Sequence, residues 1–308
     1  MAAAGEGAGV GTSLRWALAL ALLTAMAVAQ KPYFALHEVA PGVFAAIGTP
    51  GSGAGSNAGF IIGDNSVLVV DTFQKVEAAQ ALLAAIREKT ALPVRFVVNT
   101  HYHLDHVTGN RVFADAGATI MAQRNVRAWI HTENLKFFGP HPTAAAQATV
   151  AGLRAPDLVY DDGVEIDLGR RRVVVEVRPG HTGGDSVVRT EGAIFTGDLF
   201  WRHSLPNLID ASTGPLVATL RTLAADAPAG TAFIPGHGEV GTAADVDEFR
   251  GYIEDLRHQT TPAALAAKYA GWTGYSHFIG PNLADMAAEL NGTKRIPSAP
   301  GGAATPRP

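Results

Sequence analysis

The chain has 308 residues, of which 47% are hydrophobic and 17% are charged, an ordinary balance for a globular protein. It carries 24 Lys and Arg against 28 Asp and Glu, a formal net charge of -4, so no cationic surplus favours nucleic acid as a partner. It contains no cysteine, which excludes disulfides, thiolate metal ligands and cysteine nucleophiles. Any metal site must therefore use His, Asp, Glu or backbone oxygen.

The N-terminal segment has the pattern of an export signal. Arg15 precedes an apolar stretch at 16–29 that ends in the letters AVA, and small residues in this A-x-A arrangement are typical of a cleavage site. We therefore predict that residues 1–29 are a signal peptide cleaved between Ala29 and Gln30, and that the mature protein is periplasmic or secreted. The apolar stretch is short for a membrane span, so no stable span is expected after cleavage. An uncleaved anchor is the alternative.

Strands and helices alternate from residue 33 onward. Apolar and β-branched runs predict strands at 43–47, 59–62, 66–71, 94–98, 118–122, 164–168, 172–177, 186–189, 193–196 and 232–234. Apolar residues at helical spacing predict helices at 75–90, 110–116, 123–132, 216–225, 243–259 and 262–269. Residues 133–156 fit neither pattern and are interpreted as an irregular insertion. Two groups of strands, each mixed with helices, predict an α/β fold in which two packed sheets carry helices outside, a four-layer arrangement.

The same pass along the chain predicts the domain boundaries. The alternating elements indicate one main domain at 33–260. A helical extension follows at 261–290. The last residues, 291–308, are rich in Pro, Gly and Ala and are predicted to form a disordered tail.

The densest group of polar residues follows the predicted strand at 94–98. It consists of His101, His103, Asp105 and His106, so three imidazoles and one carboxylate fall within six residues. In extended chain, His101 and His103 would point the same way. Such a group is costly to bury in a core, whereas zinc readily accepts nitrogen and oxygen ligands. The group therefore predicts a metal site.

Three more polar residues follow predicted strands and sit beside glycine: His181, Asp198 and His237. Glycine lets the backbone approach closely and turn sharply. A single histidine beside glycine is usually structural, but the group at 101–106 makes further ligands expected. We therefore predict that the ends of four strands converge on one metal-binding pocket.

The order of these seven residues, His-x-His-x-Asp-His followed by His, Asp and His, resembles the metallo-β-lactamase-fold hydrolase superfamily over roughly residues 33–260. The resemblance implies an αββα sandwich with the site at one edge of the two sheets. It implies that one metal is held by His101, His103 and His181, and a second by Asp105, His106 and His237. It also implies that Asp198 bridges the two metals and that Asp71 supports the site from behind the ligands.

The resemblance further implies two zinc ions per chain and a metal-bound hydroxide as the nucleophile, with Asp105 orienting it as the catalytic carboxylate. The dinuclear β-lactamases of the superfamily generally lack a bridging Asp at the position of Asp198. We therefore favour hydrolysis of a small ester, thioester or lactone, with β-lactam hydrolysis as the alternative. The expected partner is a small-molecule substrate.

Two readings of another class stay open. A persulfide dioxygenase with a single iron keeps a similar motif, and a non-catalytic metal-binding protein would need only the ligands. The sequence makes no prediction of the oligomeric state or of the particular substrate.

Overall fold

The computed structural model describes residues 31–297 of the chain. The chain divides into two units, residues 1–32 and Tyr33–Pro308, and every helix and strand below belongs to the second. The predicted signal peptide at 1–29 lies outside the described residues, as does the predicted tail beyond 297. Residues 291–297 contain neither helix nor strand. Among the described helices, none combines the length and the apolar character that crossing a bilayer requires.

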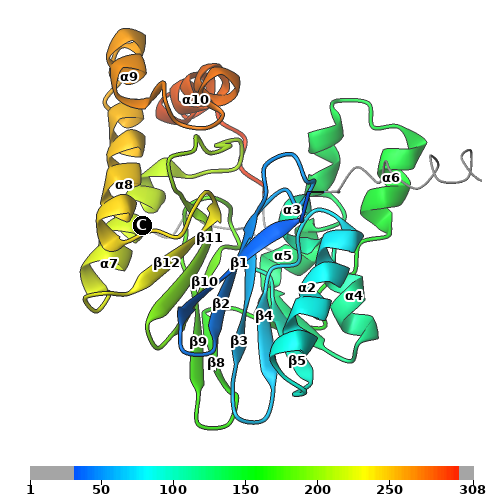
Figure 1. Ribbon diagram of the computed structural model, residues 1–308. Helices are drawn as coiled ribbons and strands as arrows, with labels where there is room; N and C mark the ends of the chain where they lie inside the picture. Colours follow the sequence, from blue (N-terminus) through cyan, green and yellow to red (C-terminus); the bar gives the residue numbers. More distant parts are fainter. Residues whose placement is uncertain (1–30, 298–308) are drawn as a thin grey trace, which may run out of the picture. The chain divides into compact units, whose positions relative to one another are not determined.

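One sheet has seven strands in the order β1-β2-β3-β4-β5-β6-β7 (Figure 1). Neighbouring strands pair antiparallel from β1 to β4 and parallel from β4 to β7. The strands are β1 (Phe34–Ala40), β2 (Val43–Gly48), β3 (Ala58–Ile62), β4 (Val67–Val70), β5 (Val94–Val98), β6 (Thr119–Gln123) and β7 (Leu158–Tyr160).

The second sheet has five strands in the order β12-β11-β10-β9-β8. The pair β11 and β12 is parallel, and the other pairs are antiparallel. The strands are β8 (Gly163–Asp167), β9 (Arg172–Val177), β10 (Ser186–Thr190), β11 (Ala193–Trp201) and β12 (Ala232–His237).

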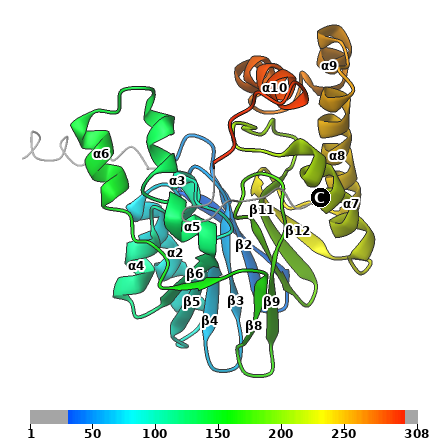
Figure 2. The same ribbon diagram turned by 180° about the vertical axis from the view of Figure 1, so that it is seen from behind.

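Alternation along the buried strands divides the core into layers. In β4, Val67 and Val69 belong to the apolar cluster beneath the helices, whereas Leu68 and Val70 belong to the cluster between the sheets. The helices covering the seven-stranded sheet include α2 (Val76–Lys89) and α4 (Asn110–Asp115), and those covering the five-stranded sheet are α7 (Thr213–Asp226) and α8 (Ala243–Arg257) (Figure 2). This arrangement confirms the predicted four-layer αββα sandwich.

Several segments differ from the sequence prediction. The predicted irregular insertion, 133–156, contains the 3₁₀ helix η1 (Glu133–Phe138) and α6 (Ala144–Ala151). Two strands at the ends of the seven-stranded sheet, β1 and β7, were not predicted, because β1 is a half-exposed edge strand without clean alternation and β7 has three residues. The remaining helices are α3 (Leu104–Val107), α5 (Arg124–Trp129), α9 (Pro262–Tyr269) and α10 (Tyr275–Leu290).

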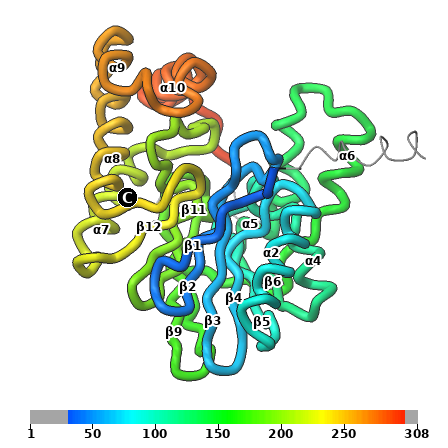
Figure 3. The backbone as a smooth tube through the Cα atoms, viewed as in Figure 1, coloured from blue at the N-terminus to red at the C-terminus, as the bar shows by residue number. Residues whose placement is uncertain are grey.

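Two segments outside the two sheets and the helices that cover them lie at the same edge of the sandwich. The segment carrying η1 and α6 rises beside the seven-stranded sheet, and α10 rises beside the five-stranded sheet, as the chain trace shows (Figure 3). The linker before α10 is fastened to the chain after β11, because Leu205 N donates to Thr273 O and Thr273 N donates to His203 O, both at 2.9 Å. The loops between β2 and β3 and after β5 reach this edge as well.

A single buried side chain ties the two sheets together at this edge. The amide of Asn57, before β3, donates to Pro235 O of β12 at 2.9 Å and to Gly238 O, just after β12, at 2.8 Å. Its carbonyl oxygen accepts from Gly48 N at 2.9 Å. Asn57 is 5% exposed, so water does not replace these partners when the side chain is lost.

We expect Asn57→Ala to lower the free energy of unfolding by about 1–3 kcal/mol, because it leaves buried backbone groups without partners. Urea unfolding of the metal-free protein measures this change. Gln80→Ala, at an exposed position on α2, is the control and should stay within about 0.5 kcal/mol of the wild type. Equal losses in both variants would contradict the role of Asn57 as a tie between the sheets.

Candidate metal centre

The first group of predicted ligands lies between β5 and α3. After β5 ends at Val98, the chain bends at Thr100 and His101, and His103 takes extended dihedrals as the residue before α3. The ring centroids of His101 and His103 are 4.6 Å apart, and those of His101 and His106 are 4.2 Å apart. The turn into α3 thus gathers all three imidazoles at the end of one buried strand.

The structure brings all seven predicted ligands together in two groups that can each hold a metal ion. The first group contains His101, His103, His181 and Asp198, and the second contains Asp105, His106 and His237. Within each group the potential ligand atoms lie within 4.8 Å of one another. His181 follows His103 by 78 positions, and His237 follows His101 by 136 positions. The fold therefore brings together ligands that are far apart in the sequence.

Asp198 lies between the two groups and presents one oxygen to each. Its Oδ2 is 3.3 Å from His181 Nε2 and 3.8 Å from His101 Nε2. Its Oδ1 is 3.1 Å from His106 Nε2 and 3.4 Å from His237 Nε2. A carboxylate in this position can bridge two cations.

Asp198 and His237 lie within strands, whereas the sequence prediction placed them after strands ending at 196 and 234. Strand β11 continues to Trp201 and β12 to His237. The pairing of β11 with β12 shifts register around Gly197, whose φ is +51°, a conformation that favours glycine. This irregularity turns Asp198 toward the site while the strand continues, a feature that an apolar run does not reveal.

Glycine is required beside the Asp198 carboxylate. A Cβ atom at Gly236 would overlap Asp198 Oδ1, so β12 can pass Asp198 only without a side chain at this position. Gly236, which precedes His237, is therefore needed to leave room for Asp198 on the neighbouring strand β11.

Asp71 lies behind the imidazoles, as the resemblance implied. Its Oδ1 accepts from Thr100 N at 2.8 Å, and its Oδ2 accepts from Thr100 Oγ1 at 2.7 Å. The same Oδ2 is 2.8 Å from His106 Nδ1, and Thr100 Oγ1 is 3.1 Å from His101 Nδ1. With Nδ1 protonated, both rings turn Nε2 toward Asp198, so one carboxylate orients two imidazoles, directly and through a hydroxyl.

A second orienting carboxylate, Asp210, was not predicted from the sequence. Its Oδ2 lies 2.9 Å from His103 Nε2 and accepts from Tyr102 OH at 2.5 Å. Lys136 Nζ of η1 contacts Asp210 Oδ1 at 2.5 Å and Tyr102 OH at 2.8 Å. Asp210 follows no strand and has no glycine beside it, so the pattern that identified the other residues does not extend to it.

His181 is held through its own loop. The carboxylate of Asp185 accepts from His181 N at 2.8 Å, from Thr182 N at 2.8 and 2.9 Å, and from Thr182 Oγ1 at 2.5 Å. The loop therefore closes on Asp185 and directs the His181 ring inward, where Nε2 lies 3.1 Å from His103 Nδ1.

Burial and charge act differently on the two groups of imidazoles. Burial lowers the pKa of His101 and lowers the pKa of His181 to about 3, so both rings are neutral and have a lone pair to donate. Burial also opposes protonation of His106, but the carboxylates of Asp198, Asp105 and Asp71 outweigh it and raise its pKa. A cation bound in the second group would replace the proton on that ring.

The ring and carboxylate atoms that face the centre have no partner of their own. Among the described residues, buried atoms without a hydrogen bond include His101 Nε2, His106 Nε2, His237 Nε2 and Asp198 Oδ1. Leaving buried polar atoms unpaired is costly, so this cluster needs a bound species. Imidazole nitrogen and carboxylate oxygen without sulfur fit zinc and similar divalent ions.

The centre opens into a cavity of about 440 Å³, here called the apolar cavity. Its apolar wall is formed by Leu104, Phe137, Trp201 and Phe278. The Trp201 ring stacks on His237 with centroids 3.7 Å apart, and the Phe137 ring meets His103 edge-on at 4.9 Å. Its other lining residues are Gly55, Gln74, His103, Asp105, Asp198, Ser204, Asn207, His237, Thr273 and Gly274.

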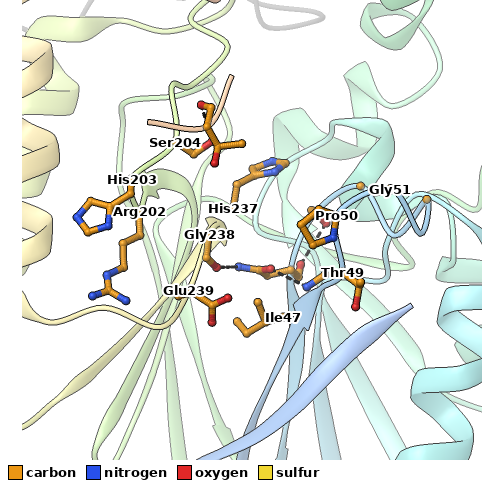
Figure 4. A pocket seen from close by; sticks show the side chains of 16 residues that line it. Ile47, Thr49, Pro50, Gly51, Arg202, His203, Ser204, His237, Gly238 and Glu239 are labelled. Atoms are coloured by element: carbon orange, nitrogen blue, oxygen red, sulfur yellow. Dashed lines mark hydrogen bonds between the residues drawn. The ribbon is translucent and has the colours of Figure 1, made fainter. Parts of the chain in front are cut away.

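A second cavity of about 500 Å³, here called the polar cavity, adjoins the first (Figure 4). It lies between the loop carrying Thr49 and Pro50 on one side and Arg202 and His203 on the other, and His237 faces it. The two cavities share Gly55, Ser204, His237 and Thr273.

We expect Gly236→Ala to weaken metal binding on the order of 10–100-fold, because the new methyl group displaces the Asp198 carboxylate. Competition with a fluorescent zinc chelator measures the affinity, and circular dichroism checks the fold. Gly251→Ala, in α8 with open space around the new methyl group, is the matched control and should keep wild-type affinity. Unchanged affinity in folded Gly236→Ala would show that Asp198 does not need its observed position.

We expect Asp210→Asn to reduce zinc affinity or turnover by about 10–100-fold, because His103 loses the charged partner that fixes its ring. The same zinc competition assay measures the affinity. Asp226→Asn removes an exposed carboxylate at the end of α7 and should leave affinity unchanged. If the two variants behaved alike, Asp210 would have no role in positioning His103.

Comparison with known proteins agrees with this fold. Residues 51–245 match the family model of the metallo-β-lactamase superfamily. An uncharacterized protein of Mycobacterium tuberculosis is 27% identical over 192 residues, which cover 58% of this chain and 85% of that protein. A hydroxyacylglutathione hydrolase of Brucella anthropi is 29% identical over 184 residues, which cover 59% of this chain and 61% of that enzyme.

A solved structure supports the same fold and nothing beyond the fold. The chain is similar to a metallo-β-lactamase from Pontibacter korlensis with a TM-score of 0.56 and 17% sequence identity, over 72% of this chain and 99% of that one. The family model covers more than half of the chain, which confirms the resemblance seen in the sequence. The chain therefore belongs to the metallo-β-lactamase superfamily.

Proposed function

We propose that this protein is an exported dizinc hydrolase that acts on a small ester, thioester or lactone. The observation that carries the proposal is the position of Asp198, which presents one oxygen to each of two imidazole groups at the floor of a cavity. Superfamily membership supports a hydrolase, and the unpaired ring nitrogens support bound metal.

The ligand set favours zinc at both groups. Each group offers imidazole nitrogens and one carboxylate, Asp198 in the first group and Asp105 in the second. Zinc accepts such a set of ligands without sulfur. Two such ions, when bound, would supply Lewis acidity toward a carbonyl oxygen and would make water more acidic. Asp71 and Asp210 keep the imidazoles oriented for this purpose.

Asp105 is the carboxylate best placed to act on the reacting water. Its side chain is 24% exposed and lines the apolar cavity, whereas that of Asp198 is 3% exposed. Asp105 Oδ2 lies 3.3 Å from His237 Nε2, so the carboxylate is held at the centre while still facing the cavity. There it can accept a hydrogen bond from water and orient it toward a carbonyl carbon.

The reaction balances as a simple acyl transfer to water. The bond between the acyl carbon and the leaving oxygen or sulfur breaks, and the hydroxyl of water takes its place on the acyl carbon. The remaining proton of water goes to the leaving atom. Asp105 can carry this proton between the two.

The bridging Asp198 and the relatives favour an acyl ester or thioester over a β-lactam. Relatives at 27–29% identity include hydroxyacylglutathione hydrolases, whose name describes cleavage of an acyl group from a thiol. The solved β-lactamase is similar in fold at 17% identity. A likeness of fold at that identity gives no information about the substrate of this chain.

Export is proposed from the N-terminal segment alone. A charged residue, a short apolar stretch and an A-x-A end precede Gln30, as in secretory signals. A chain without cysteine has no thiol to be oxidised outside the cytoplasm. N-terminal sequencing of the secreted protein would test cleavage between Ala29 and Gln30.

We expect the purified mature protein to contain about two zinc ions per chain and to hydrolyse members of a panel of small esters, thioesters and lactones. Removal of metal by a chelator should abolish turnover, and added zinc should restore it. Elemental analysis and panel assays, with nitrocefin as the β-lactam probe, measure both properties. One iron per chain, nitrocefin as the best substrate, or metal without hydrolysis of any probe would each contradict the proposal.

A further inference from the structure

We infer that the two cavities divide the substrate between them: the apolar cavity receives an uncharged, apolar acyl group, and the polar cavity receives a polar leaving group that is not anionic. The assignment rests on the hydrolase function proposed above. It names the substrate class more narrowly, because it fixes the chemistry on each side of the bond that breaks.

The apolar cavity has aromatic walls on two sides from segments far apart in the chain. Phe137 belongs to η1 and Phe278 to α10, which rise on opposite sides of the site edge. The Phe137 side chain is 37% exposed although it is large and apolar. Trp201 forms the floor beside His237, with its ring 6.3 Å from that of Phe278. Burial of an apolar group of the substrate against these side chains would make binding more favourable.

Charge in the apolar cavity is confined to the metal centre. Its lining includes no Lys, Arg or Glu, and its ionisable members are His103, Asp105, Asp198 and His237. Lys136 lies next to Phe137 in the sequence, but its ammonium group is paired with Asp210 and Glu133. An acyl group carrying its own carboxylate would find no free cation there and would lose its hydration.

The polar cavity differs in that charged side chains away from the metal centre, Arg202 and Glu239, line it. Its cation, Arg202, donates to Asp245 Oδ1 at 3.0 Å and to Val240 O at 2.8 Å, and His203 is paired with Glu248 at 3.0 Å. Glu239 is exposed and has no ion pair among the residues that the structure describes. The unbalanced charge of this cavity is therefore negative, which favours a neutral or cationic leaving group.

Contact with the metal centre sets the orientation of the substrate. The apolar cavity reaches both ligand groups and includes His103 and Asp198 of the first, whereas the polar cavity reaches the centre only at His237 of the second. A carbonyl held toward the first group places its acyl chain against Phe137 and Phe278. The leaving oxygen or sulfur then points past His237 into the polar cavity, where it takes up its proton after the bond to the acyl carbon breaks.

The acyl assignment is tested with a series of esters that share one neutral leaving group and differ in acyl length. In the zinc-loaded wild type, kcat/KM should rise about 2–4-fold per added CH₂ until the cavity is full. In Phe278→Ala, short acyl groups should lose about 3–10-fold while longer ones gain, so that the two length profiles cross. Phe138→Ala is the control, because Phe138 is 41% exposed beside Phe137 but does not line the cavity.

The leaving-group assignment is tested with one acyl group and neutral, cationic and anionic leaving groups. Glu239→Lys should raise kcat/KM for the anionic leaving group about 2–5-fold relative to the neutral one and leave the acyl-length profile unchanged. Glu191→Lys makes the same change of charge at the turn between β10 and β11 and should have no selective effect.

The outcomes separate the two proposals. If the zinc-loaded wild type hydrolysed no ester, thioester or lactone, the proposed function would fail before the cavities were tested. If it hydrolysed them but Phe278→Ala shifted every acyl length equally, the apolar cavity would not be the acyl site. If Glu239→Lys altered the acyl-length profile and left the charge preference unchanged, the two cavities would be assigned the wrong way round.

Discussion

The arrangement of the centre depends on one buried carboxylate, Asp198, that faces two groups of imidazoles at once. A carboxylate that is 3% exposed is tolerated only if opposite charge or hydrogen bonds compensate for lost hydration. Its immediate neighbours at 3.1 to 3.8 Å are ring nitrogens, most of them buried and without other partners. Burial lowers the pKa of His101 and of His181 and keeps these two rings neutral, so a bound cation rather than a proton on either ring would compensate for the buried carboxylate.

The sandwich provides the position of this carboxylate through backbone irregularities. The two sheets could pack with regular strands, yet β11 shifts register at Gly197 and β12 passes Asp198 at Gly236. Asn57 then fastens the seven-stranded sheet to the chain around that passage, at Pro235 and Gly236 in β12 and at Gly238 just after it. The same edge that interrupts regular pairing is thus held by specific hydrogen bonds, which keeps the irregular backbone in place.

The sequence predicted the layers and the seven residues of the centre because both depend on strong local patterns. Alternating apolar runs identify buried strands, and imidazoles beside carboxylates after such a run are hard to explain as core. Asp210 and Lys136 carry no such pattern, since one follows no strand and the other lies in a segment interpreted as irregular. The course of β11 through Asp198 was also missed, because a register shift arises from pairing with another strand and leaves no periodic trace.

The segment at 133–138 couples the wall of the apolar cavity to the orientation of a ligand. Lys136 contacts Asp210, which orients His103, and the next residue, Phe137, meets the same ring edge-on. The helix α10, which carries Phe278, contacts the segment around Asp210 at other points: Asn282 donates to Pro206 O at 3.0 Å, and Glu289 accepts from Thr213 N at 2.8 Å. Removing the Phe278 ring leaves these hydrogen bonds in place, so it alters the fit of a bound group and keeps the support of Asp210. A displacement of η1 alters both, because the wall and the support of His103 move as one piece.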